Sequence, residues 1–97
     1  MSMYIVLINY TQQGIANIKE SPDRATAARE LARTCGAEMK DFYMTLGVYD
    51  IVVTVEAPND QAMAKFTLAL ASLGNVRTMT LKAFTEPEFR EIIQALP

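Results

Sequence analysis

The side chains best suited to chemistry in this sequence are tyrosines, carboxylates and one arginine that lie beside apolar segments. They are Tyr10, Tyr43, Tyr49, Asp50, Glu56 and Arg77. Tyrosine hydroxyls and carboxylates can orient a small organic molecule, and an arginine can bind a carboxylate through two parallel hydrogen bonds. Glu56 could act as a base if it were buried. We take all of these residues except Tyr10 as a candidate ligand-binding site.

The same residues also have structural interpretations. Asp50 could accept hydrogen bonds from the N–H groups of its own turn, with Tyr49 packed beneath a helix. Arg77, at the start of a predicted strand, could form a surface ion pair instead of holding a ligand. The other tyrosines could fill the core. At the level of the sequence both interpretations stay open.

Several kinds of chemistry find no residues here. The chain has no histidine, which removes the usual general base and the commonest metal ligand. The carboxylates are scattered without the spacing of a metal site, and the glycines match no phosphate-binding loop. Cys35, the single cysteine, falls on an apolar helix face and is interpreted as a small core residue rather than a nucleophile. We expect no metal and no cofactor, and we assign no catalytic residue.

Length, composition and charge narrow the class of protein. Ninety-seven residues fit a single domain spanning residues 1–97, and 51% hydrophobic with 21% charged residues is typical of a globular chain. A net charge of −2, a pI near 5.0 and scattered basic residues argue against nucleic-acid binding. No apolar run is long enough to cross a bilayer, and one cysteine cannot form an intrachain disulfide. We therefore expect a cytoplasmic protein with no nucleic-acid or membrane partner.

Hydrophobic periodicity places these residues on a short series of strands and helices. Strands are predicted over residues 3–11, 37–46, 50–57 and 76–84, and helices over residues 21–35 and 59–73, with a last helix after a capping box at residues 85–88. Ser21 is predicted to cap the first helix, and Gly47 to open the hairpin with a positive φ. The order β-α-β-β-α-β with right-handed crossovers predicts a ferredoxin-like α+β sandwich with an extra C-terminal helix.

The face of this sheet that points away from the helices needs a cover of its own. The first strand is apolar on both sides, and Tyr43, Val52 and Phe84 are predicted to add apolar surface to that face. Monomers rarely expose an apolar patch of this size. The sequence therefore predicts a homodimer packed sheet to sheet. The alternatives are a monomer, or a face covered by the last helix.

Polar residues interleave with these apolar ones and are predicted to line the space between the two sheets. They are Thr45, Thr54, Glu56, Thr78, Thr80 and Lys82. A buried charge is costly unless it is paired. Glu56 and Lys82 are therefore predicted either to pair with each other or to reach solvent at the rim.

An ordered set of short motifs resembles the GYD-domain family, small bacterial and archaeal proteins named for a Gly-x-Tyr-Asp signature. Here the signature is Gly47-Val48-Tyr49-Asp50. The other matching segments are residues 10–15, 19–24, 42–46, 55–58, 73–78 and 83–85. The resemblance covers almost the whole chain and implies a ferredoxin-like domain similar to the dimeric α+β-barrel proteins. It implies no particular reaction, so no catalytic residue is carried over.

Two functions are compatible with these residues. In the first, the domain binds a small organic molecule in an apolar cleft between the sheet and the helices, with Tyr43, Tyr49 and Asp50 orienting it. In the second, it is a non-catalytic assembly or interaction module, whose second sheet face and last helix serve only assembly. The α+β-barrel fold hosts enzymes and regulators alike, so the fold alone does not choose between the two functions.

Overall fold

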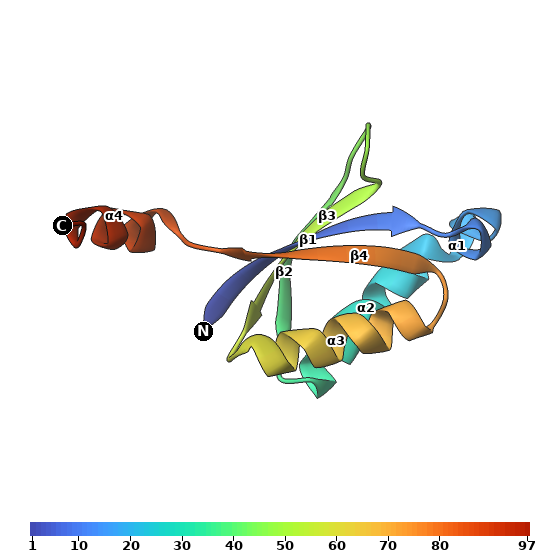
Figure 1. Ribbon diagram of the computed structural model, residues 1–97. Coiled ribbons are helices and arrows are strands. Elements are labelled where there is room, and N and C mark those ends of the chain that lie inside the picture. Colours follow the sequence, from blue (N-terminus) through green and yellow to red (C-terminus); the bar gives the residue numbers. More distant parts are fainter.

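The computed structural model describes residues 1–97 and contains a four-stranded sheet with helices beside it (Figure 1). The strands are β1 (Ser2–Tyr10), β2 (Glu38–Met44), β3 (Ile51–Ala57) and β4 (Val76–Ala83). The helices are α1 (Gln12–Ala16), α2 (Ser21–Thr34), α3 (Asp60–Ser72) and α4 (Glu86–Gln94), and a 3₁₀ turn over Ile18–Glu20 precedes α2. The predicted strands and main helices agree with these bounds to within two residues.

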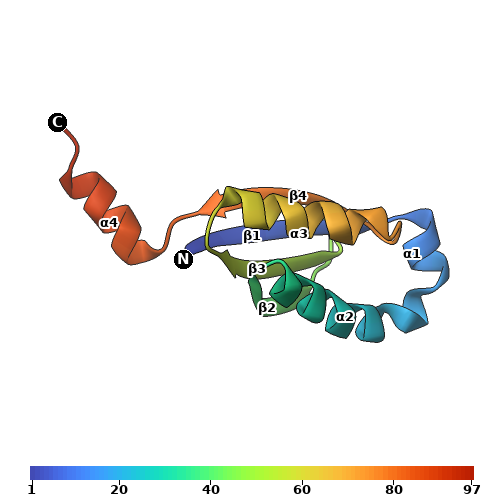
Figure 2. The same ribbon diagram turned by 90° about the horizontal axis from the view of Figure 1, so that it is seen from below.

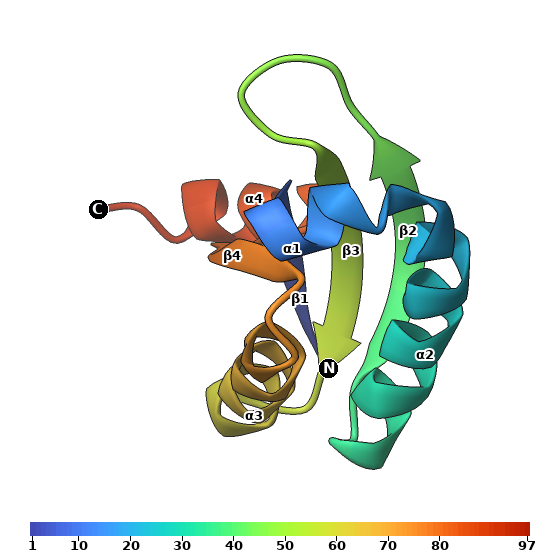
Figure 3. The ribbon, with the colours of Figure 1, turned by 90° about the vertical axis from the view of Figure 1, so that its right-hand side faces the viewer.

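The sheet is antiparallel throughout, with the strand order β2-β3-β1-β4 and a shift of register in β2 between Met39 and Asp41. Each crossover passes over one strand, which puts α2 and α3 on the same side of the sheet (Figure 3). We call the other side the open face. It is formed by Met3, Ile5, Leu7 and Asn9 of β1, Glu38, Asp41 and Tyr43 of β2, Val52, Thr54 and Glu56 of β3, and Arg77, Met79 and Leu81 of β4. The predicted ferredoxin-like α+β sandwich with an extra C-terminal helix is confirmed.

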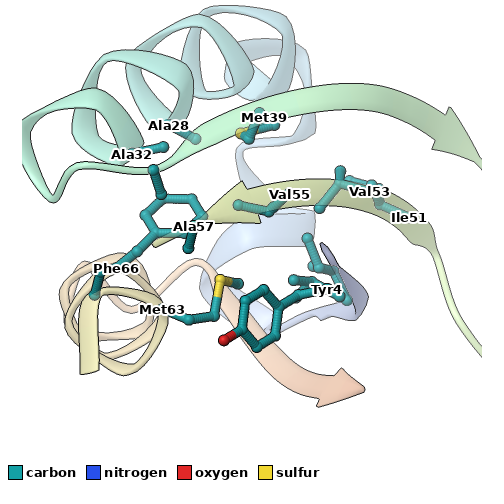
Figure 4. Packing of buried hydrophobic residues seen from close by; sticks show 14 residues of the cluster. Tyr4, Ala28, Ala32, Met39, Ile51, Val53, Val55, Ala57, Met63 and Phe66 are labelled. Atoms are coloured by element: carbon teal, nitrogen blue, oxygen red, sulfur yellow. The ribbon is translucent and has the colours of Figure 1, made fainter. Parts of the chain in front are cut away.

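The core fills the space between the sheet and the helices α2 and α3 (Figure 4). Alternate residues of β1 and β3 point into it, as the period of a strand requires. Phe66 of α3, which is 1% exposed, reaches toward Ala32 of α2 and Ala57 of β3. Cys35 packs against the edge of this core, in keeping with its interpretation as a small apolar residue. Only 15 of the 97 residues are buried, so the protomer relies on one thin apolar layer.

β4 turns the opposite faces to those predicted. Its polar residues pair with residues of β1 that point toward the helices, and the pairs are Thr78–Ile8, Thr80–Val6 and Lys82–Tyr4. The prediction that these polar residues line the open face was wrong. The more apolar side of β4, with Met79 and Leu81, faces away from the helices. The open face is therefore more apolar than the sequence suggested.

Two further expectations fail: the pairing of Glu56 with Lys82, because of this facing, and the place of Phe84 in the sheet, because β4 ends at Ala83. Glu56 lies on the open face and Lys82 on the helix side, so they cannot pair. The Lys82 Nζ atom instead lies 3.6 Å from the Asp60 Oδ1 atom. Phe84 follows the end of β4 instead of belonging to the sheet, and it is exposed.

Ser21 does not cap α2. The chain passes into α2 directly from the 3₁₀ turn Ile18–Glu20, so Glu20 is the N-cap residue and no side chain caps the helix. The Ser21 hydroxyl lies 2.7 Å from the Tyr10 hydroxyl instead. The capping box predicted for the last helix is confirmed, and the Asn59 side chain caps α3 by accepting a hydrogen bond from the Ala62 N–H.

α4 stands apart from the rest of the molecule (Figures 1 and 2). It projects beyond the end of β4, and every residue from Phe84 to Pro97 is exposed. The alternative in which the last helix covers the open face of its own sheet is therefore wrong. The radius of gyration is 14.6 Å, against about 12.5 Å for a compact chain of this length. No helix in the structure has the length and apolar character needed to cross a membrane.

Gly47 has a φ of +122°, which confirms the predicted role of glycine in the hairpin. A Cβ at this position would meet no atom within 4 Å, so the cost of a side chain comes from the backbone conformation alone. We expect Gly47→Val to lower the free energy of unfolding by roughly 1–3 kcal/mol in chemical denaturation. The control Val48→Ala, at the exposed next position, should change it by less than about 0.5 kcal/mol. Equal effects in the two variants would show that the conformation of Gly47 carries no cost.

Candidate functional site

The Gly-x-Tyr-Asp segment ties the β2–β3 hairpin to the end of β1. The Asp50 Oδ2 atom accepts a hydrogen bond of 2.9 Å from the Tyr10 N–H, and the Asp50 N–H donates to the Ile8 carbonyl oxygen at 2.9 Å. The Asn9 side-chain amide donates to the Val48 carbonyl oxygen at 2.8 Å. The structural interpretation expected Asp50 to cap its own turn, and this is wrong. Asp50 binds the backbone of a neighbouring strand.

This role predicts a cost for removing the Asp50 carboxylate. Asp50→Ala leaves the Tyr10 N–H without its partner, and hydrogen bonds to charged groups contribute about 1.5–3 kcal/mol. We expect the free energy of unfolding to fall by about that amount in urea denaturation. The control Glu30→Ala, which removes a carboxylate from an exposed pair with Arg33, should cost less than about 1 kcal/mol. A cost no larger than that of the control would mean that water replaces the carboxylate at Tyr10.

Both candidate tyrosines belong to the open face. Tyr49 reaches over it from the hairpin, and its hydroxyl lies 3.6 Å from the Met79 Sδ atom. It does not pack beneath a helix. Tyr43 projects from β2 opposite Val52 and is 60% exposed. These rings extend the apolar surface of the open face.

The two charged candidates lie at opposite ends of the open face. Arg77 is opposite Asn9 at the hairpin end, and it forms no ion pair within the chain. Glu56 is opposite Met3 at the other end. The five candidate residues thus do not converge on one cavity in the protomer, and their role in binding stays a prediction.

A cleft of about 460 Å³ lies between the sheet and the two main helices. It is lined by residues from Ser21 to Leu31 of α2 and from Phe66 to Ser72 of α3, two helices that lie on the same side of the sheet (Figure 2). Its volume falls within the range of ligand sites, and 16 of its 20 lining residues are hydrophobic. An apolar cleft between sheet and helices is therefore present, but none of the five candidate residues lines it. Tyr10, which was named from the sequence together with these five but left out of the candidate site, does line the cleft.

The polar groups of this cleft lie near α1. The hydroxyls of Tyr10 and Ser21 are 2.7 Å apart. Arg24 donates to the carbonyl oxygens of Asn17 and Gly14, each at 3.0 Å, which fixes its guanidinium in the cleft wall. Ser21 and Arg24 were not among the site residues predicted from the sequence. The run of alanines on α2 is the signal that could have found the cleft, because their short side chains leave space beneath the helix.

A second polar cluster joins β1, α3 and β4. The Tyr4 hydroxyl donates to the Asp60 Oδ1 atom, and the Lys82 Nζ atom lies 5.3 Å from the centre of the Tyr4 ring. The hydrogen bond from Tyr4, and then the charge of Lys82, lower the pKa of Asp60. The same hydrogen bond, with burial, raises the pKa of Tyr4. Both pKa values move away from neutrality, which suits a structural bond better than proton transfer near neutral pH.

Two of the segments that resemble the GYD-domain family, residues 10–15 and 73–78, contact each other where α1 meets the end of α3. The Thr11 N–H donates to the Asn75 carbonyl oxygen at 3.0 Å, and the Thr11 hydroxyl donates to the Gly74 carbonyl oxygen at 2.6 Å. Gly14 lies so close to this loop that a Cβ would stand 2.1 Å from the Asn75 oxygen. These residues join α1 to the end of α3. Their motif is explained by packing and not by a ligand.

Comparison with known proteins gives a family and a relative. A sequence model of the GYD domain matches residues 4–93. The chain is also 39% identical over 84 residues to the glutamine synthetase and cystathionine beta-lyase binding protein of Thermus thermophilus. That match covers 86% of this chain and 88% of the relative.

Solved structures share the fold. A feast or famine regulatory protein from M. tuberculosis, complexed with L-methionine, matches with a TM-score of 0.67 and 16% identity over 88% of this chain. This chain spans about half of that regulator, 51% of its length, so the likeness shows the fold alone. The protein TTHA0845 from Thermus thermophilus matches with a TM-score of 0.57 and 25% identity, over 88% of this chain and 95% of that one.

Proposed function

The chain belongs to the GYD domain family, and we propose that it acts as a homodimeric binding protein whose partners are other proteins. The observation that carries this proposal is the apolar open face. Ile5, Leu7, Val52, Met79 and Leu81 lie side by side on three adjacent strands, and no helix covers them. Monomers rarely leave so large an apolar patch in water. A second copy packed sheet to sheet would bury it.

The accessible surface of the chain supports an interface with a second copy. The accessible surface of the chain is 6491 Å². A compact monomer of the same mass exposes about 5,500 Å². The excess of roughly 1,000 Å² is close to the approximately 800 Å² that each partner contributes to a standard interface.

The mass of the particle in solution tests the dimer. We expect sedimentation velocity at micromolar concentration to give twice the chain mass of 10.8 kDa. In that particle, the open-face candidates Tyr43, Tyr49, Glu56 and Arg77 are proposed to line the seam between the sheets, while Asp50 keeps its bond to β1. A particle with the mass of one chain would rule this arrangement out.

The relative from Thermus thermophilus is named for binding glutamine synthetase and cystathionine beta-lyase. We propose the same class of partner, a metabolic enzyme, for this chain, with residues 1–97 acting as one domain in the cytoplasm. The test uses purified glutamine synthetase and purified cystathionine beta-lyase from the organism that makes this chain. Each enzyme is titrated against the labelled dimer, and at least one of them should show saturable binding. An unrelated enzyme of similar size is the control. Equal signals from all three enzymes would exclude this partner class.

The cleft between α2 and α3 favours a second function, the binding of a small apolar molecule with one hydrogen-bonding group. Its size, its apolar walls and the Tyr10–Ser21 hydroxyl pair support this function. A thermal-shift screen with aromatic acids and quinones tests it. Ala25→Leu, which places a larger side chain in the cleft, should abolish any rise in melting temperature. Thr26→Leu, at an exposed position on the same helix, should preserve it.

A further inference from the structure

We propose that α4 of each copy packs against the β2–β3 hairpin loop of the other copy. This inference rests on the homodimer proposed above and identifies the partner of an element that its own chain leaves bare. One apolar stripe runs along α4 and just past its end, formed by Phe89, Ile92 and Ile93 of the helix and by Leu96 after it. Their spacing of three and four residues puts them on one side of the helix. All four are between 44% and 60% exposed.

A helix this short needs something to pack against. α4 has 9 residues, and isolated helices below about 12–15 residues are only marginally stable in water. The capping box of Thr85 and Glu88 supports its first turn but leaves the apolar stripe uncovered. The helix projects beyond the end of β4 (Figure 1), so the cover does not come from its own chain.

A matching apolar surface is exposed on the hairpin loop, residues 45–50. Leu46 and Val48 are 94% and 82% exposed. The loop stands out from the sheet (Figure 3). The strand register places it beside the last residues of β1, whereas the chain leads into α4 beside the first residues of β1. Within one chain the two apolar surfaces thus lie at opposite ends of the sheet and cannot meet.

Charges on the open face indicate how two copies are oriented. Glu38 and Glu56 are direct neighbours on β2 and β3 at the α4 end, and Arg77 lies at the hairpin end. If the two sheets faced each other with their β1 strands running in the same direction, the acidic ends of both copies would lie together. If the two β1 strands run in opposite directions, the acidic end of each copy lies over the end of the other copy that carries Arg77. This arrangement is electrostatically favourable.

The same orientation brings the two apolar surfaces together. With the β1 strands of the two copies in opposite directions, the α4 end of each copy lies over the hairpin end of the other. The Phe89–Leu96 stripe can then cover Leu46 and Val48 of the partner. Two-fold symmetry makes this contact twice, because whatever the first copy does to the second, the second does to the first.

Cysteine cross-linking between two variants of the full chain tests the contact. Both variants carry Cys35→Ser to remove the native thiol; one adds Leu46→Cys and the other Ile93→Cys. An equal mixture of the two, oxidised after exchange of subunits, should form a disulfide-linked pair several-fold more than either variant alone. The matched control replaces Ile93→Cys with Glu91→Cys, which lies on the opposite side of α4. That control mixture should cross-link no more than the single variants.

Mass measurements on the same samples separate the possible failures. A dimer whose Leu46→Cys and Ile93→Cys mixture cross-links no better than the Glu91→Cys control would overturn the α4 contact and leave the homodimer standing. A monomer would overturn both proposals. A chain carrying both Leu46→Cys and Ile93→Cys that closes a disulfide within itself as a monomer would show that α4 folds back on its own hairpin, which also overturns the contact.

Discussion

Gly14→Ala should lower the free energy of unfolding by about 2–4 kcal/mol, a large part of the roughly 5–15 kcal/mol that stabilises a domain. Gly14 is buried in α1, and a Cβ would stand 2.1 Å from the Asn75 carbonyl oxygen. That oxygen belongs to the backbone and already accepts the Thr11 N–H, so it cannot swing aside. The added methyl group must separate α1 from the loop that follows α3.

The sign of this effect makes it a demanding test. Alanine forms helices better than glycine by about 1 kcal/mol, so helix propensity alone would make Gly14→Ala stabilising. Gln12→Ala, at an exposed position in the same short helix, is the control and should change the free energy of unfolding by less than about 0.5 kcal/mol. Guanidinium denaturation of both variants measures the difference. A Gly14→Ala variant at least as stable as the wild type would mean that α1 can move away from the loop without cost.

Val52→Lys should weaken the proposed homodimer by about 3 kcal/mol or more, roughly a hundredfold or greater rise in its dissociation constant. Val52 lies between Leu7 of β1 and Tyr43 of β2, near the middle of the open face. Two-fold symmetry would bury a lysine from each copy in the same seam, and a buried charge without a partner is costly. Sedimentation velocity over a dilution series measures the change.

The matched control keeps the lysine but moves it to the other side of the sheet. Thr80 is exposed and pairs with Val6, whose side chain points toward the helices, so Thr80→Lys should leave the dissociation constant almost unchanged. Circular dichroism checks that Val52→Lys protomers keep their secondary structure. Equal association of the two variants would remove the open face as the interface.

The fold was predictable because its signals are local. Strand and helix periods, the capping box at residues 85–88 and the glycine at the hairpin each require only a few neighbouring residues to be recognised. The facing of β4 was not predictable by the same means. Met79 and Leu81 look like core residues, and only their pairing with β1 shows that they face away from the helices.

The candidate site was harder to predict because its residues were selected by chemical type. Asp50 uses its carboxylate on a backbone N–H of a strand 40 residues away in the sequence, a bond that no local pattern reveals. The cleft depends on what α2 lacks, since its alanines are read as ordinary helix formers until their distance from α3 is known. Arg24 is held in the cleft wall by the carbonyl oxygens of Gly14 in α1 and of Asn17 just before the 3₁₀ turn, contacts that no local pattern reveals.

The shift of register in β2 has a consequence for how far assembly can proceed. β2 is an outer strand, and the shift between Met39 and Asp41 leaves Lys40 out of regular pairing with β3. Bulges and charged side chains on an outer strand discourage a foreign strand from adding to the sheet. Growth of the sheet along the hydrogen-bonding direction is therefore hindered on that side. In the proposed homodimer, a two-fold contact through the open face buries that face in both copies, so neither copy keeps an open face for a third.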